Sequence, residues 1–259
     1  MDNKNTNGLQ KEADFQDSKI EHGVRANQER FYCDRATAEM RECQKQLVGS
    51  LKGKRVLDIG CGTGENTISA LEEGAFVTAI DISPASIEYV KQCAAQKGLE
   101  KNLTAIVMDA QDMQLENGCV DVVIGGGVLH HLPRLEQALG EIARVLTPAG
   151  YAVFHEPMGI NPLINLYRSA TPDKRTDDET PFKTKQLELI KKIFPNTRFV
   201  FFDNATLFSK IFIALHMPGL ADKLQGFLLK IDRKMLRGKS NKITFAKKMA
   251  WIVVLKMQK

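Results

Sequence analysis

The 259-residue sequence lacks long hydrophobic runs and paired cysteines. Its longest apolar stretches, such as Val120 to Leu129, are shorter than the roughly 20 residues of a membrane-spanning helix, so we expect none. The five cysteines are odd in number and include no C-x-x-C pair, which favours reduced thiols in a cytoplasmic protein without a structural zinc site. Residues 1–5 are polar and predict no signal peptide.

Acidic residues are scarce in the last third of the chain. Residues 183–259 contain 17 Lys and Arg but only 4 Asp and Glu, whereas residues 1–182 contain 19 and 27. The formal net charge of +5 therefore hides an acidic body, with a net charge of −8, and a basic last third, with +13. Such asymmetry raises the question of a nucleic-acid or membrane-surface partner.

Short apolar runs alternate with helical patterns through the middle of the chain. Buried strands are predicted at 55–60, 76–81, 103–109, 120–125 and 150–155, with helices at about 66–74, 84–98 and 133–146 between them. This alternation predicts an α/β fold with a doubly wound, mostly parallel sheet, whose strand ends bind ligands. Two later β-rich runs, 197–203 and 251–256, are candidates to complete the sheet.

The segments on either side of this core differ from it in pattern. Residues 1–50 are expected to supply an N-terminal tail and lid helices, with 1–15 disordered or loosely docked and 17–50 helical. Residues 51–157 are expected to form the ligand-binding core. Residues 158–259 are expected to form a substrate lid or cap and the final strands of the same domain, with a loop at 157–185 and helices at 207–231, interrupted at Pro218.

A glycine-rich turn, residues 58–64 (DIGCGTG), follows the first predicted strand. Glycines let the backbone approach a ligand, and the N-terminus of the following helix offers unpaired N–H groups. Asp81 closes the second strand, in a position suited to binding ribose hydroxyls. Dinucleotide-binding turns have a third glycine or an alanine where this chain has Glu65, which would repel a pyrophosphate. The turn therefore favours a cationic cofactor over NAD or FAD.

Five ordered motifs resemble those of class I S-adenosylmethionine-dependent methyltransferases that act on small molecules. They are residues 56–64 (VLDIGCGTG), Asp81, residues 108–110 (MDA), residues 121–132 (DVVIGGGVLHHL) and residues 144–150 (RVLTPAG). The resemblance covers about residues 50–157 and implies a Rossmann-like, seven-stranded sheet whose last strand runs antiparallel. One departure is Ala149, where many members have a second glycine.

The resemblance also implies how S-adenosylmethionine would be held. The glycines of the turn would line its methionine part, Asp81 would hold the ribose, and Ile82 would lie against the adenine. The cofactor-binding residues so implied are Asp58, Gly60, Gly62, Gly64, Asp81, Ile82, Asp109, Ala110, Gly125, Gly126 and Tyr32.

The remaining contacts would complete the cofactor site. Asp109 would accept a hydrogen bond from the adenine amino group, with the backbone of Ala110 nearby, and the carbonyl of Gly125 or Gly126 would accept from the cofactor's ammonium. Tyr32, in the N-terminal segment, would contribute a hydroxyl from a lid. In the alternative interpretation the glycines only shape turns and the aspartates only cap helices.

Titratable side chains gather where the fourth and fifth strands are predicted to end. Methyl transfer to a hydroxyl needs a base to remove its proton, and transfer to an amine needs the amine neutral. The candidate catalytic residues are His131, His130, His155 and Glu156. One histidine of the adjacent pair could instead make a structural hydrogen bond. His155 and Glu156 lie on opposite faces of a strand, so one of them is expected to face the cavity. No metal site is predicted, because a defining ligand spacing is absent.

The basic last third admits three interpretations. Nucleic-acid methylation is disfavoured, because an N/D-P-P-aromatic motif is replaced by residues 125–128 (GGGV) and neither strand end offers a nucleophilic cysteine. An apolar and basic helical stretch, residues 207–237, suits a peripheral membrane surface or a lipophilic substrate. The remaining interpretation is a helix packed on the sheet with a solvated lysine face.

These observations together predict S-adenosylmethionine-dependent transfer of a methyl group to an oxygen or nitrogen of a small molecule, a specialised metabolite. The alternatives are a membrane-surface lipid or quinone methyltransferase and a cofactor-binding protein without transferase activity. Asn161, Asn165 and Arg168 are candidates to bind polar groups of the acceptor or to cap local turns. The sequence does not predict the oligomeric state.

Overall fold

The computed structural model describes residues 10–18, 35–170, 179–214, 217–236 and 242–259. Its centre is a seven-stranded sheet with the strand order β3-β2-β1-β4-β5-β7-β6, in which β7 runs antiparallel to both of its neighbours. The strands are β1 (Arg55–Ile59), β2 (Phe76–Asp81), β3 (Leu103–Val107), β4 (Val120–Gly126), β5 (Leu146–Pro157), β6 (Arg198–Phe202) and β7 (Ile252–Gln258). The predicted doubly wound, mostly parallel sheet with an antiparallel last strand is confirmed.

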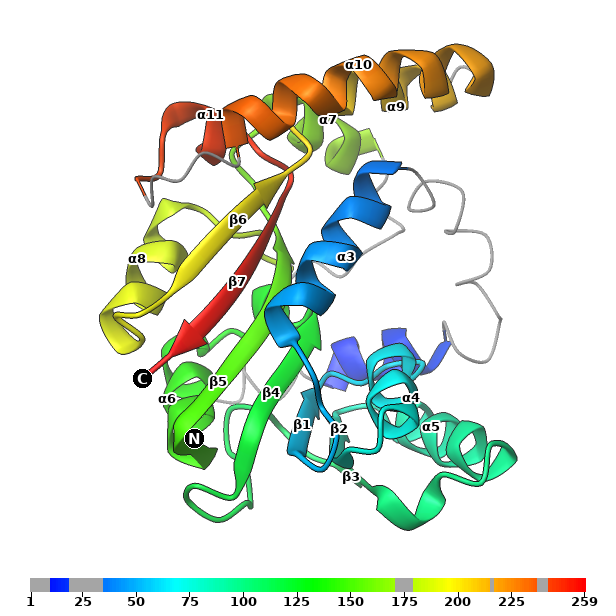
Figure 1. Ribbon diagram of the computed structural model, residues 1–259, viewed down its shortest axis with the longest axis vertical. Coiled ribbons are helices and arrows are strands. Elements are labelled where there is room, and N and C mark those ends of the chain that lie inside the picture. The colour runs from blue at the N-terminus through cyan, green and yellow to red at the C-terminus, as the bar shows by residue number, and fades with distance from the viewer. Residues whose placement is uncertain (1–9, 19–34, 171–178, 215–216, 237–241) are drawn as a thin grey trace.

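Helices connect the strands and cover the sheet (Figure 1). They are α3 (Arg35–Val48), α4 (Glu65–Glu72), α5 (Pro84–Gln96), α6 (Leu135–Val145), α7 (Pro162–Ala170), α8 (Thr184–Ile193), α9 (Leu207–Ala214), α10 (Pro218–Leu236) and α11 (Phe245–Lys248), with short 3₁₀ turns η1 (Glu100–Asn102) and η2 (Leu129–His131). The helix after Ser83 begins as expected, since the Ser83 hydroxyl accepts a hydrogen bond from the Ser86 amide at 2.9 Å and Pro84 occupies the first position.

The two faces of the sheet carry different helices because side chains alternate along each strand. On β5, Phe154 faces α6 and α8, where it joins Leu139 and Ile190 in the largest apolar cluster. Its neighbour Val153 faces the other side and packs with Met40 of α3. Helices α4 and α5 cover the same side as α3, over β1, β2 and β3. The core is therefore a three-layer α/β/α arrangement.

A second group of helices lies beyond one end of the sheet. Helices α7, α9, α10 and α11 lie together above the strands in Figure 1, at the end where β4 and β5 finish. Asp232 of α10 is 2% exposed, and its carboxylate accepts hydrogen bonds from the amides of Ala205 and Thr206 at 2.8 and 3.1 Å. This anchors α10 to the turn between β6 and α9.

Two expectations from the sequence are corrected. Residues 157–185 are expected from the sequence to be a loop or lid, yet they include α7, whose first turn is capped by Asn161: its side-chain oxygen Oδ1 accepts a hydrogen bond from the Leu163 amide at 2.9 Å. Residues 10–15 were expected to be disordered or loosely docked, yet residues 10–18 are helical and Asp17 contacts Ser83 of the core. In the described part of the chain, no helix has the length and apolar character needed to cross a bilayer.

Candidate active site

The turn between β1 and α4 has backbone conformations that only glycine adopts without strain. Gly60 and Gly64 have φ values of +66° and +77°. A Cβ atom on Gly60 would lie 2.6 Å from Cγ2 of Val128, in the loop after β4. Glycine therefore lets the β1 turn and the β4 loop approach each other at the edge of the sheet where the predicted site lies.

Two carboxyl groups flank this turn. Asp81 at the end of β2 accepts hydrogen bonds from the amides of Gly62 and Ser83, both at 2.9 Å, and joins the turn to the start of α5. Asp58 is 0% exposed and accepts from the Thr67 hydroxyl at 2.6 Å. The pKa of the Asp58 carboxyl is raised to about 7, mainly by burial and in part by the charge of Asp81. The hydrogen bond from Thr67 acts in the opposite direction and lowers this pKa.

This carboxyl pair fits a cationic ligand. The second oxygen of Asp58, Oδ1, is buried and has no hydrogen-bond partner among the described residues. A positive group placed beside the turn would offset the repulsion between Asp58 and Asp81, whereas a pyrophosphate would add to it. The donor set and charge of the turn therefore suit the sulfonium and ammonium groups of S-adenosylmethionine.

The other cofactor-binding candidates lie along the same edge. Asp109 accepts from the Gln111 amide at 2.8 Å, and its carboxylate lies 3.5 Å from the Arg134 guanidinium. Ala110 is buried and Ile82 is half-buried. The carbonyl of Gly125 accepts a hydrogen bond of 3.4 Å from the Gln44 side chain. Tyr32 lies outside the described residues.

A cavity of about 570 Å³ lies beside the ends of β4 and β5. All four candidate catalytic residues line it: His130, His131, His155 and Glu156. Its apolar wall comes from residues of α3, α7 and β7 and from the loop before β7, namely Met40, Ile164, Trp251 and Ile252. The volume is typical of small-molecule sites, which span roughly 300–1,000 Å³.

His155, at the end of β5, is positioned by two neighbours. Its Nδ1 lies 2.8 Å from Oε1 of Gln44 on α3, and its ring packs against Gly126, where a Cβ atom would overlap the ring. Because the Gln44 oxygen can only accept, Nδ1 carries the proton and Nε2 keeps its lone pair. Among the described residues, none hydrogen-bonds Nε2. Burial lowers the pKa of His155, so the ring is neutral at pH 7.

Glu156 points to the opposite side of β5 and holds the loop after β4. It is 0% exposed, and its carboxylate accepts from the amides of Val128 at 3.1 Å, Leu129 at 2.9 Å and His130 at 3.3 Å. It also lies 2.7 Å from Nδ1 of His130. Both His155 and Glu156 thus border the cavity, but both oxygens of the Glu156 carboxylate are already bonded to groups of the protein.

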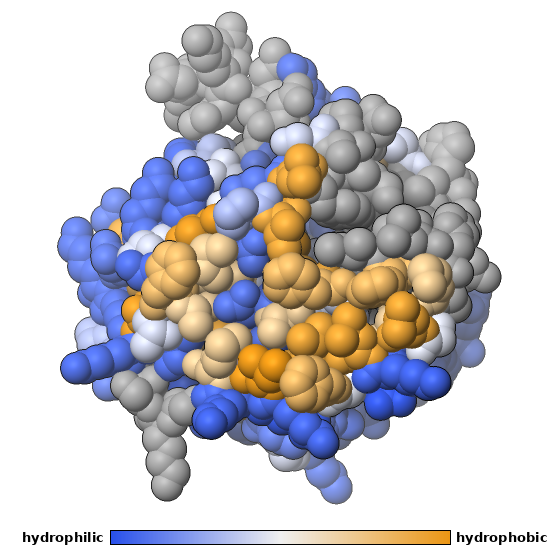
Figure 2. Space-filling model, turned by 90° about the horizontal axis from the view of Figure 1, so that it is seen from above, coloured by the Kyte–Doolittle hydropathy of each residue, from blue (hydrophilic) through white to orange (hydrophobic). Residues whose placement is uncertain are grey.

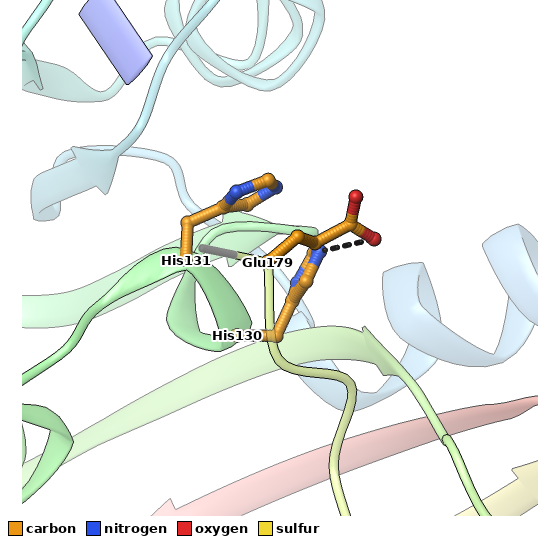
Figure 3. A group of neighbouring side chains, drawn as sticks. All are labelled: His130, His131 and Glu179. Carbon is orange, nitrogen blue, oxygen red and sulfur yellow. Dashed lines mark ion pairs between the residues drawn. The ribbon is translucent and has the colours of Figure 1, made fainter. Parts of the chain in front are cut away.

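The other nitrogen of His130 faces Glu179, as Figure 3 shows. His130 Nε2 lies 3.4 Å from Oε1 of Glu179, and the same oxygen accepts from the Arg168 guanidinium at 2.7 Å. The potential ligand atoms of His130, His131 and Glu179 all lie within 4.8 Å of one another, as in a metal site. The two carboxylates, Glu156 and Glu179, are however balanced in charge by His130 and Arg168 without a metal ion.

The cluster fixes the charge of His130. Burial by itself would lower the pKa of His130, but the hydrogen bonds to Glu156 and Glu179 outweigh it and raise the pKa to about 9. Burial likewise opposes ionisation of Glu179, yet His130 and Arg168 lower its pKa to about 2. His130 is therefore an imidazolium at pH 7, suited to binding or orienting a group and unable to accept a proton.

This charge predicts how stability depends on pH. The folded-state pKa of His130 lies above its unfolded value of about 6.5, so its stabilisation is fully present below pH 6.5 and is lost as pH rises through about 9. The loss is on the order of 3 kcal/mol. Urea unfolding at several pH values between these limits should show this decline in the wild type. His130→Gln should remove it, whereas His155→Gln, whose histidine has a lowered pKa, should leave it.

Several site residues escaped the sequence interpretation. Gln44 interrupts the buried face of α3 formed by Ala36, Met40 and Leu47, and a polar residue on an apolar helical face was the available signal. Glu179 follows a charged stretch that offers no signal. Glu12 reaches the site from the helical segment 10–18, with its Oε1 3.4 Å from Nδ1 of His131.

The expected acceptor contacts have different outcomes. Asn161 is 3% exposed and donates to the Met249 carbonyl at 2.7 Å while starting α7, which matches the turn-capping alternative. Asn165 donates to the Gly159 carbonyl at 3.2 Å. Arg168 lines the cavity beside Glu179.

Comparison with known families now decides the relationship. The profile of the family described as "Methyltransferase domain" matches residues 50–199, more than half of the chain. The chain belongs to this methyltransferase-domain family. The match extends beyond the five motifs to the start of β6, so it includes the histidines of the cavity and Glu179. The parts of the cavity wall from α3 and β7, such as Met40 and Ile252, lie outside it.

Individual relatives share only part of their length with this methyltransferase-domain chain. The ubiquinone biosynthesis O-methyltransferase of Bordetella avium is 30% identical over 123 residues, 48% of this chain and 50% of that protein. The aklanonic acid methyltransferase of a Streptomyces species is 36% identical over 109 residues, 41% of this chain and 49% of that protein. The chain thus spans about half the length of the curated relatives it matches.

Solved structures share the fold of this chain. An N-methyltransferase of Haemonchus contortus, solved with phosphomonomethylethanolamine and S-adenosylhomocysteine, superposes with a TM-score of 0.60. It is 16% identical, and the alignment covers 94% of this chain and 57% of that protein. At this identity the likeness shows the Rossmann-like fold alone.

Proposed function

We propose that this protein transfers a methyl group from S-adenosylmethionine to an oxygen or nitrogen of a small molecule. One observation carries the proposal. An acidic glycine turn that suits a cationic cofactor is followed directly by Glu65, which lines a cavity of about 570 Å³ together with a neutral, oriented histidine, His155. The family match and the methyltransferase relatives support it.

Asp58, Gly60, Gly62, Gly64 and Asp81 are the residues that would hold the cofactor's methionine and ribose parts. Ile82, Asp109, Ala110, Gly125 and Gly126 would complete that site, as proposed from the motifs. When bound, S-adenosylmethionine supplies a methyl group already activated by its positive sulfur, so the protein needs to supply only position and proton removal. The helical segment 10–18, whose Phe15 lines the cavity and whose Asp17 contacts Ser83, would act as the lid over both parts.

His155 is the general base in this proposal. Its Nε2 carries the lone pair because Gln44 holds the proton on Nδ1, and its lowered pKa keeps it unprotonated at pH 7. It would take the proton from an acceptor hydroxyl, or from an ammonium group before transfer. His130 also lines the cavity. It is charged and held in place by Glu156, and it would orient the methyl acceptor by contact with one of its polar groups.

The cavity indicates the kind of acceptor. Met40, Ile164 and Trp251 of the lining suit an apolar body, and His130 and His155 of the same lining suit a polar group. A small specialised metabolite with an aromatic or aliphatic skeleton and one hydroxyl or amine fits this distribution. The relatives named for ubiquinone biosynthesis and for aklanonic acid support acceptors of this type.

A transfer assay tests the proposal. The protein is incubated with S-adenosylmethionine labelled in its methyl group and a panel of apolar phenols, quinols and amines, and label is measured in the extracted acceptors. We expect label in one acceptor class and release of S-adenosylhomocysteine in equal amount. Cofactor binding without transfer to any member of the panel would favour the alternative of a cofactor-binding protein without transferase activity.

A further inference from the structure

The apolar side chains exposed at the surface are concentrated on one side of the molecule. Of the eleven large hydrophobic residues exposed in the described part of the chain, eight lie in or directly before α7, α9, α10 and α11. We call the surface that they form the cap face: Leu163, Leu166, Phe208, Met217, Leu220, Phe227, Met235 and Phe245. Figure 2, which views the molecule from above, shows a broad apolar area bordered by hydrophilic residues.

Helix α10 shows that this exposure is built into the sequence. Its inner side is already buried, by Ala221, Leu229 and Leu236. Leu220 and Phe227, seven residues apart, lie on the outer side and are 44% and 62% exposed. The helix is held in this orientation by Asp232 on the inside and by an ion pair between Asp222 and Arg35 of α3 at 3.1 Å. The outer apolar strip is therefore a fixed surface of the folded protein.

A row of lysines follows this strip. Lys223 and Lys230 lie four and three residues from Phe227, and Lys234 lies seven residues after it. All three are therefore on the same outer side of α10, and all three are exposed. Lysine side chains with this placement extend their charge to the edge of an apolar surface. Helix α10 as a whole contains four Lys and Arg residues and two Asp residues, a net charge of +2. An apolar centre with cations at its border complements the interface of a bilayer that contains anionic lipids.

Helix α7 connects the cap face with the cavity. Leu163 and Leu166 are 39% and 69% exposed on the outer surface, whereas Ile164 and Arg168 of the same helix line the cavity. Helix α7 alone would therefore separate an acceptor dissolved in the lipid from the cavity that contains His155.

We propose that the cap face docks the protein on membranes that contain anionic lipids, with Leu166, Leu220 and Phe227 in the interface and the three lysines at the phosphate level. The proposal does not require methyl transfer, because it concerns the surface alone. It deepens the proposed function by placing the cavity next to a store of lipophilic acceptors.

Vesicle co-sedimentation of the full chain without cofactor tests the docking. The probes are phosphatidylcholine vesicles with about 30% phosphatidylserine, and phosphatidylcholine vesicles alone. We expect the wild type to bind the anionic vesicles only, and to bind at least 10-fold more weakly when the salt concentration rises from about 0.1 M to about 0.5 M. Calorimetry with S-adenosylmethionine on the same preparation separates a failure of docking from a failure of the proposed function.

Matched variants assign the effect to the cap face. Replacing Lys223, Lys230 and Lys234 together by glutamine should weaken vesicle binding about 100-fold, whereas the same change at the exposed Lys52, Lys91 and Lys101 should weaken it much less. Phe227→Asp should abolish binding, and Phe76→Asp, at an exposed phenylalanine of β2, should not. All these positions are exposed, so unchanged melting temperatures are expected.

Two results would overturn the proposal. One is a wild type that binds neither kind of vesicle. The other is a dimer in solution that Phe227→Asp converts to a monomer without any vesicle binding, since the cap face would then contact a second copy of the chain.

Discussion

Glu156→Ala is expected to lower the free energy of unfolding by about 3–5 kcal/mol, because Glu156 is fully buried and holds a buried charge and several amides. The change removes the acceptor for three backbone amides after β4 and leaves the His130 imidazolium buried without its carboxylate at 2.7 Å. Urea unfolding at pH 7 measures the loss. Because the charge on His130 is part of the cost, the pKa of His130 should fall in the variant.

Glu72→Ala is the matched control. Glu72 pairs with Lys97 at 2.5 Å, but both side chains are about half exposed, so its removal should cost less than about 0.5 kcal/mol. Glu156→Gln, which keeps one acceptor oxygen but not the charge, should fall between the two. Equal losses for Glu156→Ala and Glu72→Ala would show that the loop after β4 does not depend on this carboxylate.

His155→Ala is expected to lower the rate of methyl transfer by about 100-fold to 10,000-fold, with little change in affinity for S-adenosylmethionine. The physical reason is the loss of the neutral ring nitrogen that removes the acceptor's proton. Turnover is measured with the acceptor that the labelled-methyl panel identifies. Burial lowers the pKa of His155, so the wild-type rate should rise with pH through this lowered pKa and be level at pH 7, and the variant should lose this rise.

Gln44→Ala separates positioning from chemistry. It removes the acceptor that keeps the proton on Nδ1 but leaves the ring in place against Gly126, so the loss of rate should be smaller than in His155→Ala and the pH profile should persist. Unchanged turnover in His155→Ala, with a large loss in His131→Ala, would move the base to the β4 loop.

The sequence predicted the parts of the fold that local chemistry determines. The Gly60 turn, the Ser83 cap and the alternation of strands follow from backbone conformation and apolar periodicity, and the structure has all of them. Helix α7 is not predicted by its sequence, because its start signals, Asn161 and Pro162, are equally typical of loops. The helical segment 10–18 was missed because its place depends on contacts with Ser83 and His131, far away in sequence.

The sequence predicted which residues form the candidate active site better than it predicted the charge and role of each. The strand ends indicated His130, His131, His155 and Glu156 together, and all four line one cavity. Their charges depend on Gln44 and Glu179, which reach the cavity from α3 and from the segment before α8. No local pattern shows that Glu156 would be buried under three amides, or that His130 would be charged and His155 neutral. Such differences arise only when distant segments pack together.

Calorimetric titration with S-adenosylmethionine tests the central claim, that the β1 turn and Asp81 bind this cofactor. The account predicts one-to-one binding by the wild type. The affinity should be about 100-fold lower in Asp81→Ala, because the carboxylate that would accept hydrogen bonds from the ribose hydroxyls is lost. Asp121→Ala, at the opposite end of the sheet beside Arg55, should bind like the wild type. The account is contradicted if the wild type does not bind S-adenosylmethionine, or if Asp81→Ala binds it equally well.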